Sequence, residues 1–211
     1  VHASMQVAHF DTTAHRPLEA WVRGVNSHLP ASIGVLWAVE VDEGFHARFS
    51  AEARRYRYVL LNRRIRPGLA GGRVGWTHGD LDEEAMAVAA ACLAGEHDFT
   101  SFRAAECQAK SPVRLMHSVS VQRRGEVVVF DFHANAFLHH MIRNLVGSLV
   151  FVGKGRRPVG WMAELLAARD RSLAAPTFAP DGLYLCGVDY PPEWPLPGGG
   201  RIIAPPQLLL S

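Results

Sequence analysis

The segment "RRYRY", residues 54–58, sets guanidinium groups and phenol rings side by side in one short stretch. A guanidinium group can donate two parallel hydrogen bonds to a phosphate, and an aromatic ring can stack on a nucleobase. In an extended strand, Tyr56, Tyr58 and Leu60 share one face, while Arg55 and Arg57 share the other. These residue types favour handling of a nucleic acid over cofactor chemistry.

Positive charge is concentrated in two blocks of the chain. The formal net charge is only +2, but residues 51–73 and 107–157 each carry +6, and residues 74–106 between them carry −6. This distribution is typical of a face that binds a polyanion. Lys110 and Lys154 are the only lysines, so the positive charge is almost entirely guanidinium. Two explanations stay open: a GC-rich genome that encodes Arg in place of Lys, or recognition of phosphates and bases.

Candidates for phosphate contact are the basic residues in or near these blocks. Each of them alone can be an ordinary surface charge, but the set as a whole is suggestive. The candidates are Arg48, Arg54, Arg55, Arg57, Arg63, Arg64, Lys110 and Arg114.

Several other chemistries lack their motifs. The glycine cluster "PGLAGGRVG" matches neither the dinucleotide fingerprint nor a P-loop, and no G-x-S-x-G is present. The eleven histidines show no strong ligand spacing, and the three cysteines form no C-x-x-C pair. Polar residues interrupt the most apolar stretch, "AFLHHMIRNLVGSLVFVG". We therefore expect no cofactor, no metal, no membrane span and a cytoplasmic location.

Hydrophobic periodicity predicts the elements of the N-terminal third. Alternation of Met5, Val7 and His9 predicts an opening strand. A helix is expected between Pro17 and Pro30, and the continuous apolar run 33–40 predicts a second strand.

The rest of the chain alternates strands with helices. A strand is expected over 52–62, and Asp80 with Glu83 resembles a capping box that starts a helix ending at Gly95. Two strands are expected around a turn at Arg124-Gly125. The longest helix is expected over 136–152, a short helix from Pro158, a strand over 182–190 and an extended surface tail from Pro191.

Helices and strands joined by hairpin-like links predict an α+β fold, with an antiparallel sheet and helices packed on one side. The expected organisation is a short N-terminal α+β piece at 1–43, a larger domain at 44–190 and a Pro/Gly-rich tail at 191–211.

Four long motifs and a closing strand resemble the tRNA pseudouridine synthase A family, in register from Val1 to about Tyr190. They are "VHASMQVAHFDTT", "FHARFSAEARRYRYVLLN", "DFTSFRAAEC", "NAFLHHMIRNLVGSLVFVG" and "GLYLCGVDY". The resemblance implies a pseudouridine-synthase-like fold of two ferredoxin-like halves, the first incomplete here. It also implies an isomerase that converts uridines 38, 39 and 40 of the tRNA anticodon stem-loop to pseudouridine, and that acts as a homodimer.

The same resemblance implies that the catalytic Asp of the family is missing from the start of this chain. In the family, the stretch similar to "VHASMQVAHF" follows Arg-Thr-Asp-Ala-Gly, whose Asp is the nucleophile. This chain is therefore expected to lack that Asp, which would lie just before Val1. Loss of the preceding strands would expose a sheet edge, so we expect poor solubility or marginal stability. Met5 stands where the family often has Gly, with an effect on local packing only.

Site residues follow from the resemblance. Tyr56 matches the active-site Tyr that stacks on the uracil, and Arg143 matches the Arg that pairs with the nucleophilic Asp. Leu183 matches an apolar contact to the base, although a plain core Leu describes it nearly as well. The further expected substrate contacts are Arg48, Arg55, Arg57, Phe102, Arg103 and His2, while Tyr58, Asp98 and Asp131 are interpreted as structural.

Three hypotheses stay open on the sequence: a tRNA-uridine isomerase, a non-catalytic RNA-binding fragment, and an α+β domain whose basic blocks bind nothing. Retention of tRNA that depends on ionic strength would support either of the first two hypotheses and would contradict the third.

Overall fold

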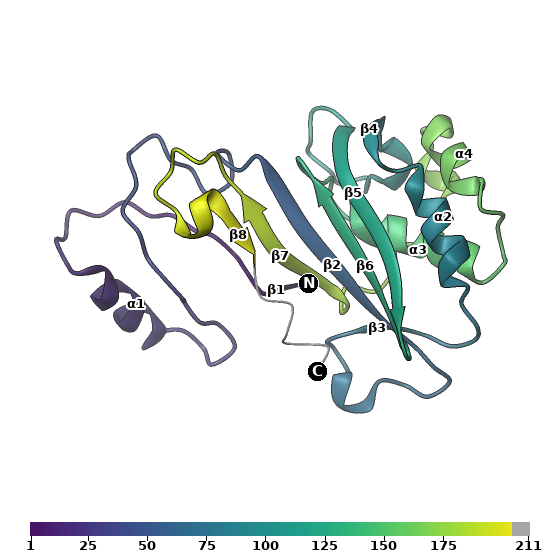
Figure 1. The fold of residues 1–211 in the computed structure, drawn as a ribbon, viewed down its shortest axis with the longest axis horizontal. Helices are drawn as coiled ribbons and strands as arrows, with labels where there is room; N and C mark the ends of the chain where they lie inside the picture. The colour runs from purple at the N-terminus through teal and green to yellow at the C-terminus, as the bar shows by residue number, and fades with distance from the viewer. Residues whose placement is uncertain (204–211) are drawn as a thin grey trace.

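The computed structural model describes residues 1–203, and its centre is an eight-stranded sheet (Figure 1). The strand order is β1-β7-β2-β6-β5-β4, with β3 beside β2 and β8 beside β7. All pairings are antiparallel except β1 with β7 and β2 with β3. The strands are β1 (His2–Ala3), β2 (Ala53–Asn62), β3 (Gly75–Thr77), β4 (Gly95–Asp98), β5 (Val113–Arg124), β6 (Val127–Ala134), β7 (Leu183–Asp189) and β8 (Arg201–Ile203).

Three of the four helices pack together against the sheet. In Figure 1, α2 (Glu83–Ala91), α3 (Met141–Gly153) and α4 (Trp161–Ala168) gather beside β4 and β5, whereas α1 (Leu18–Asn26) lies at the opposite end. The buried side chains of α3 meet Tyr58 and Leu60 of β2 in one hydrophobic cluster. The predicted class, mixed helices and strands with an antiparallel sheet, is confirmed.

Strand β2 forms the middle of the sheet and follows the predicted alternation. It pairs with β6 on one side and β7 on the other. Tyr58 and Leu60 are fully buried, whereas the guanidinium groups of Arg55 and Arg57 contact carboxylates of neighbouring strands. Over residues 54–58, β2 therefore separates an apolar face of the sheet from a polar one, whereas Val59 and Leu61, on the side of Arg57, are buried as well.

The apolar face carries two hydrophobic clusters. The main core combines β2, β5 and β6 with α2, α3 and α4. The second cluster is smaller and consists of Val7, Phe45, Leu185, Val188, Tyr190 and Leu196, with other half-buried residues around them. Tyr56 packs against both clusters and so lies at their boundary.

The N-terminal third differs from the expectation. The strand expected around Met5–His9 is limited to His2–Ala3, and residues 33–40 form no strand. The helix expected after Pro17 is present as α1, but none of its residues is buried. Apolar runs form stable strands only where a neighbouring strand completes the hydrogen bonds. The first run bonds to β7 only at its start, where Ser4 and Met5 donate to the Leu185 carbonyl, and within residues 1–203 no strand pairs with 33–40.

Helix boundaries also differ from those expected. α3 begins at Met141 instead of Ala136, because His140 adopts a left-handed backbone conformation with φ of 60°. α2 is capped by Asp82 and not by Asp80, since the Asp82 carboxylate accepts a hydrogen bond of 2.8 Å from the Ala85 backbone N–H. No helix of the described residues is long and apolar enough to cross a membrane. The expected extended tail includes β8, and its part at 204–211 lies outside the described residues.

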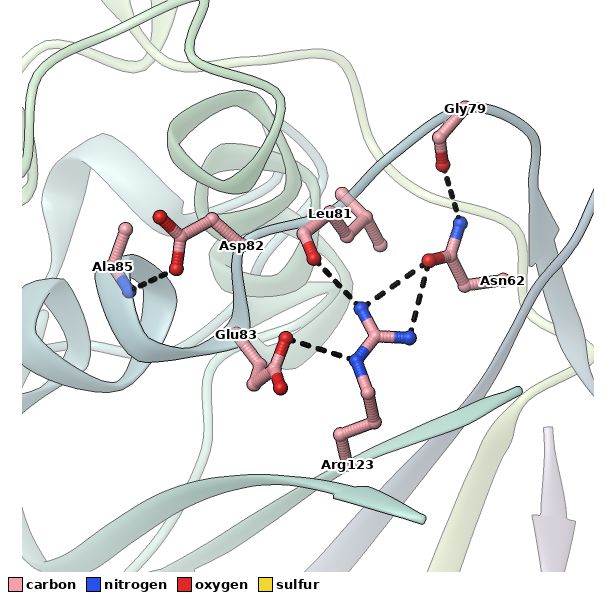
Figure 2. A network of polar contacts seen from close by, with 7 residues as sticks. All are labelled: Asn62, Gly79, Leu81, Asp82, Glu83, Ala85 and Arg123. Carbon is pink, nitrogen blue, oxygen red and sulfur yellow. Dashed lines mark hydrogen bonds and ion pairs between the residues drawn. The ribbon is translucent and has the colours of Figure 1, made fainter. Parts of the chain in front are cut away.

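Arg123 of β5 ties the start of α2 to the sheet (Figure 2). Its Nε donates to Glu83 at 2.9 Å, and its Nη2 donates to the Leu81 carbonyl at 2.7 Å. Both Nη groups lie 3.3 Å from Oδ1 of Asn62 in β2, whose own amide donates to the Gly79 carbonyl at 2.7 Å. One guanidinium thus fixes two strands and the loop before α2.

Replacing Arg123 by Ala is expected to lower the free energy of unfolding by about 1–2 kcal/mol, mainly through the hydrogen bonds lost at Leu81 and Asn62. The surface ion pair with Glu83 contributes little to this loss. Urea denaturation measures the change. The neighbouring Arg124→Ala is the control, because Arg124 is exposed; equal losses for the two variants would contradict this role of Arg123.

Candidate functional site

A cavity of about 370 Å³ opens where the two hydrophobic clusters meet. Segments far apart in the sequence form its wall: the chain after β1, the loop before β2, and strands β2 and β7. No Asp or Glu is among its lining residues, which are Gln6, Val7, Ala8, His9, His46, Ala47, Arg48, Arg54, Tyr56, Leu185, Val188 and Tyr190.

Tyr56 forms the aromatic wall of this cavity. Its ring contacts Phe137 edge-on with 5.1 Å between centroids, and its backbone pairs with Leu185 of β7. Burial raises the pKa of the Tyr56 phenol, although the charge of Arg54 opposes the shift. Tyr56 therefore stays neutral at physiological pH and presents an aromatic surface with a hydroxyl group.

Two guanidinium groups at the cavity have no carboxylate partner among residues 1–203. Arg54 donates to the backbone carbonyls of Arg48 at 2.6 Å and Asn135 at 3.3 Å. The Arg48 guanidinium carbon lies 5.5 Å from the centre of the Phe49 ring. Both therefore keep a positive charge that an anionic ligand can neutralise.

Two imidazole rings complete the wall. The centroids of His9 and His46 lie 4.3 Å apart, and Nδ1 of His46 accepts hydrogen bonds from the backbone N–H groups of Arg48 and Phe49 at 3.1 and 3.3 Å. His46 thus shapes the loop that carries Arg48. Neither histidine was among the expected site residues, because only the tertiary fold brings residues 6–9 to residues 46–56.

Arg143 lies on the same face of the sheet as Tyr56 but does not line the cavity. Its Nε donates to the Phe178 carbonyl at 2.7 Å, and the Phe178 ring packs edge-on against Tyr58 at 5.8 Å. Tyr58 is two residues from Tyr56 along β2, so Arg143 is connected through Phe178 to the face of β2 that carries Tyr56. No carboxylate pairs with Arg143 within the described part of the chain.

Leu183 and His2 lie on two neighbouring strands, β7 and β1. Leu183 is 7% exposed and stands opposite Tyr58 in the sheet. The His2 ring stacks on Tyr184 at 4.8 Å and shares a 2.9 Å hydrogen bond with the Gly72 carbonyl. Tyr184 stands opposite Arg57 in the sheet, so His2 lies on the polar face and its expected role as a substrate contact finds no support in this geometry.

The structure does not bring Arg55 and Arg57 to the cavity. They project from the opposite face of β2, where Arg55 pairs with Asp189 at 2.8 Å and Arg57 with Asp131 at 2.7 Å. A guanidinium paired with a carboxylate is locally neutral, so these two arginines are poor candidates for phosphate contact. Their role as substrate contacts finds no support in this geometry.

Phe102 and Arg103 also lie away from the cavity. Phe102 is 0% exposed within the main core, so it offers no surface to a ligand. One Nη group of Arg103 donates to the carbonyls of Cys107 at 2.6 Å and Ala109 at 2.8 Å. Both residues stabilise the fold in this structure.

Within residues 1–203, no group of three or more His, Cys, Asp or Glu side chains could hold a metal ion.

Comparison with known proteins identifies the family. A family of tRNA pseudouridine synthases matches residues 89–191. The chain is 66% identical to a tRNA pseudouridine synthase A of Aromatoleum aromaticum over 208 residues, which cover 99% of this chain and 79% of the relative. The chain belongs to the tRNA pseudouridine synthase A family. The predicted family, and with it an isomerase class, is thereby confirmed.

Two further relatives carry the same name. The identity is 62% over 197 residues with the protein of Dechloromonas aromatica, covering 93% of this chain and 75% of the relative. The identity with the protein of Bordetella petrii is 56% over 208 residues, which cover 97% of this chain and 78% of the relative.

The polar face of the sheet holds a titratable group beside the arginines. His133 shares Asp189 with Arg55 through a 2.8 Å hydrogen bond from Nε2. Burial lowers the pKa of His133, as does the charge of Arg55, against the attraction of Asp189. His133 is therefore largely neutral at pH 7, and its contact with Asp189 is a hydrogen bond more than an ion pair.

The free energy of unfolding is expected to fall as the pH drops below about 6.5, which is the pKa of an unperturbed histidine. The unfolded chain binds a proton at His133 more tightly than the folded chain does, so acid favours unfolding. His133→Gln should weaken this dependence between pH 7 and 5 in thermal melts, whereas exposed His15→Gln should not. An unchanged pH profile for the His133 variant would contradict the assignment.

Proposed function

We propose that this cavity binds a uridine turned out of the tRNA anticodon stem-loop, for isomerisation to pseudouridine at positions 38, 39 and 40. The observation that carries the proposal is the combination of Tyr56 with Arg48 and Arg54, which have no carboxylate partner within residues 1–203, in a cavity wall without Asp or Glu. Family membership supplies the reaction class. The proposal places the protein with its tRNA in the cytoplasm, as a homodimer.

The reaction rearranges one nucleoside. The N1–C1′ bond breaks, the uracil turns, and a C5–C1′ bond forms; C5 then releases its proton to solvent, and N1, freed from C1′, gains one. No net oxidation occurs, so the site must mainly hold and orient the base. A cavity with an aromatic wall and polar side chains from Gln6, Arg48 and Arg54 suits this task.

A stacked base must first leave the helix, at a cost of a few kcal/mol. Stacking on Tyr56 would return about 1–3 kcal/mol. Phosphate contacts from Arg48 and Arg54 would supply the remainder.

Arg143 is proposed to hold the nucleophilic carboxylate. Within the described residues only its Nε is hydrogen-bonded, which leaves its terminal N–H groups for an anionic partner. Leu183 is proposed as a neighbour of the base, since it stands opposite Tyr58 on the face of the sheet that carries Tyr56. His2 is not, because its ring stacks on Tyr184 on the polar face.

Binding of tRNA tests the cavity directly. Arg48→Ala and Arg54→Ala should each weaken binding and reduce the slope of log affinity against log salt by about 0.7–0.9. Arg55→Ala and Arg57→Ala are the matched controls from the opposite face and should leave the slope nearly unchanged. If the controls lose as much as the cavity variants, the cavity is not the binding site.

Tritium release from C5-labelled tRNA tests the chemistry. The assay compares this chain with one that carries, ahead of Val1, the N-terminal segment ending in the family motif Arg-Thr-Asp-Ala-Gly. Release is expected from the extended chain, and Tyr56→Ala in that chain should abolish most of it. Binding of tRNA without release by the extended chain would favour the alternative, a non-catalytic RNA-binding protein.

A further inference from the structure

A second cavity, also of about 370 Å³, lies between β3, the C-terminal half of α3 and the segment 176–179. It shares no lining residue with the first cavity. Its wall consists of Trp76, Thr77, Gly147, Val150, Phe151, Lys154, Arg156, Pro176, Thr177, Phe178 and Ala179.

Aromatic rings and cations meet in this wall. Trp76 is half-buried, and its indole N–H is already bonded to the Arg63 carbonyl at 3.0 Å. The Arg156 guanidinium carbon lies 5.2 Å from the centre of the Phe151 ring. As in the first cavity, the lining contains no Asp or Glu.

The two cations of the wall lack an anionic partner within residues 1–203. Neither Lys154 nor Arg156 forms an ion pair there. Burial lowers the pKa of the Lys154 ammonium, and the charge of Arg156 lowers it further. Two like charges at one partly buried site are unfavourable until an anion lies between them.

We propose that this second cavity binds an unpaired nucleotide of the tRNA substrate, with its base against Trp76 and its phosphate between Lys154 and Arg156. Its volume lies within the range of pockets that enclose small organic groups. Aromatic stacking with adjacent cations is the usual chemistry of single-stranded RNA recognition. The proposal rests on the proposed function only in taking tRNA as the ligand.

The wall of this cavity is linked to the first site through Arg143. Segment 176–179 bonds to Arg143 twice, since the Phe178 N–H donates to the Arg143 carbonyl at 3.2 Å and the Phe178 carbonyl accepts from Arg143 Nε at 2.7 Å. The Tyr58 hydroxyl also donates to the Ala179 carbonyl at 2.7 Å. A nucleotide in the second cavity would therefore rest on the segment that orients Arg143.

Lysine footprinting tests the occupancy. Because Lys110 and Lys154 are the only lysines, acetylation followed by peptide mass spectrometry reports each one separately. Bound tRNA should slow acetylation of Lys154 several-fold, and the double variant Arg48→Ala/Arg54→Ala should reduce this protection only as far as it reduces binding. Unchanged acetylation of Lys154 at saturating tRNA would overturn the proposal.

Matched variants test the energetics. Lys154→Ala/Arg156→Ala should weaken tRNA binding by about five-fold or more and lower the salt slope by about 1.4. Trp76→Leu should weaken binding at all salt concentrations and leave the slope unchanged. Arg157→Ala is the control, because Arg157 stacks on Trp161 at the same 5.2 Å but does not line the cavity.

The outcomes separate this proposal from the proposed function. Equal effects from Arg157→Ala and from Lys154→Ala/Arg156→Ala would mean that tRNA is held by nonspecific electrostatic attraction. This result would overturn the proposal for the second cavity and leave the proposed function standing. A parent chain that binds no tRNA would overturn both proposals.

Discussion

The packing of Tyr56 at the boundary between two hydrophobic clusters is the constraint on which the site depends. Its neighbours on β2, Tyr58 and Leu60, are fully buried in the main core, while the smaller cluster is built on Leu185, Val188 and Tyr190. Tyr56 contacts both clusters and still lines a cavity. A ring held on two sides has little rotational freedom left to lose when a base stacks on it, which favours binding.

The arginines of β2 show how one strand can serve two purposes. Arg55 and Arg57 are neutralised by Asp189 and Asp131 on the polar face, where they connect neighbouring strands. Arg54, on the other face, donates to two backbone carbonyls and to no carboxylate in the described part of the chain. The number of arginines in β2 therefore overstates how many of them can contact phosphate. Whether an arginine can bind an anion depends on whether a carboxylate already pairs with it.

Much of the fold was predictable where a local pattern matched a buried environment. The hairpin around Gly125 and the alternation of Tyr56 and Tyr58 with Arg55 and Arg57 in β2 follow local rules, and both are present. The helix α2 is also present, but its cap is Asp82 and not the predicted Asp80. The apolar run 33–40 is not a strand, because no neighbouring strand pairs with it among the described residues. The late start of α3 follows from the backbone of His140, which no spacing rule predicts.

The candidate site was predictable only in part. Tyr56 and Arg143 came from the resemblance, and the structure places both on the apolar face. His9 and His46 could not be found by spacing, since the fold alone joins their segments. Phe102 looked like a cleft residue because of its motif, but full burial removes it from any surface.

Photo-crosslinking tests the central claim most directly. A tRNA that carries 4-thiouridine at positions 38–40 would be irradiated with the protein, and the modified peptides would be mapped by mass spectrometry. The account predicts adducts at Tyr56 and in the segment 46–48. Adducts confined to the polar face, at His133 or at His117, whose ring lies 4.7 Å from that of His133, would contradict it.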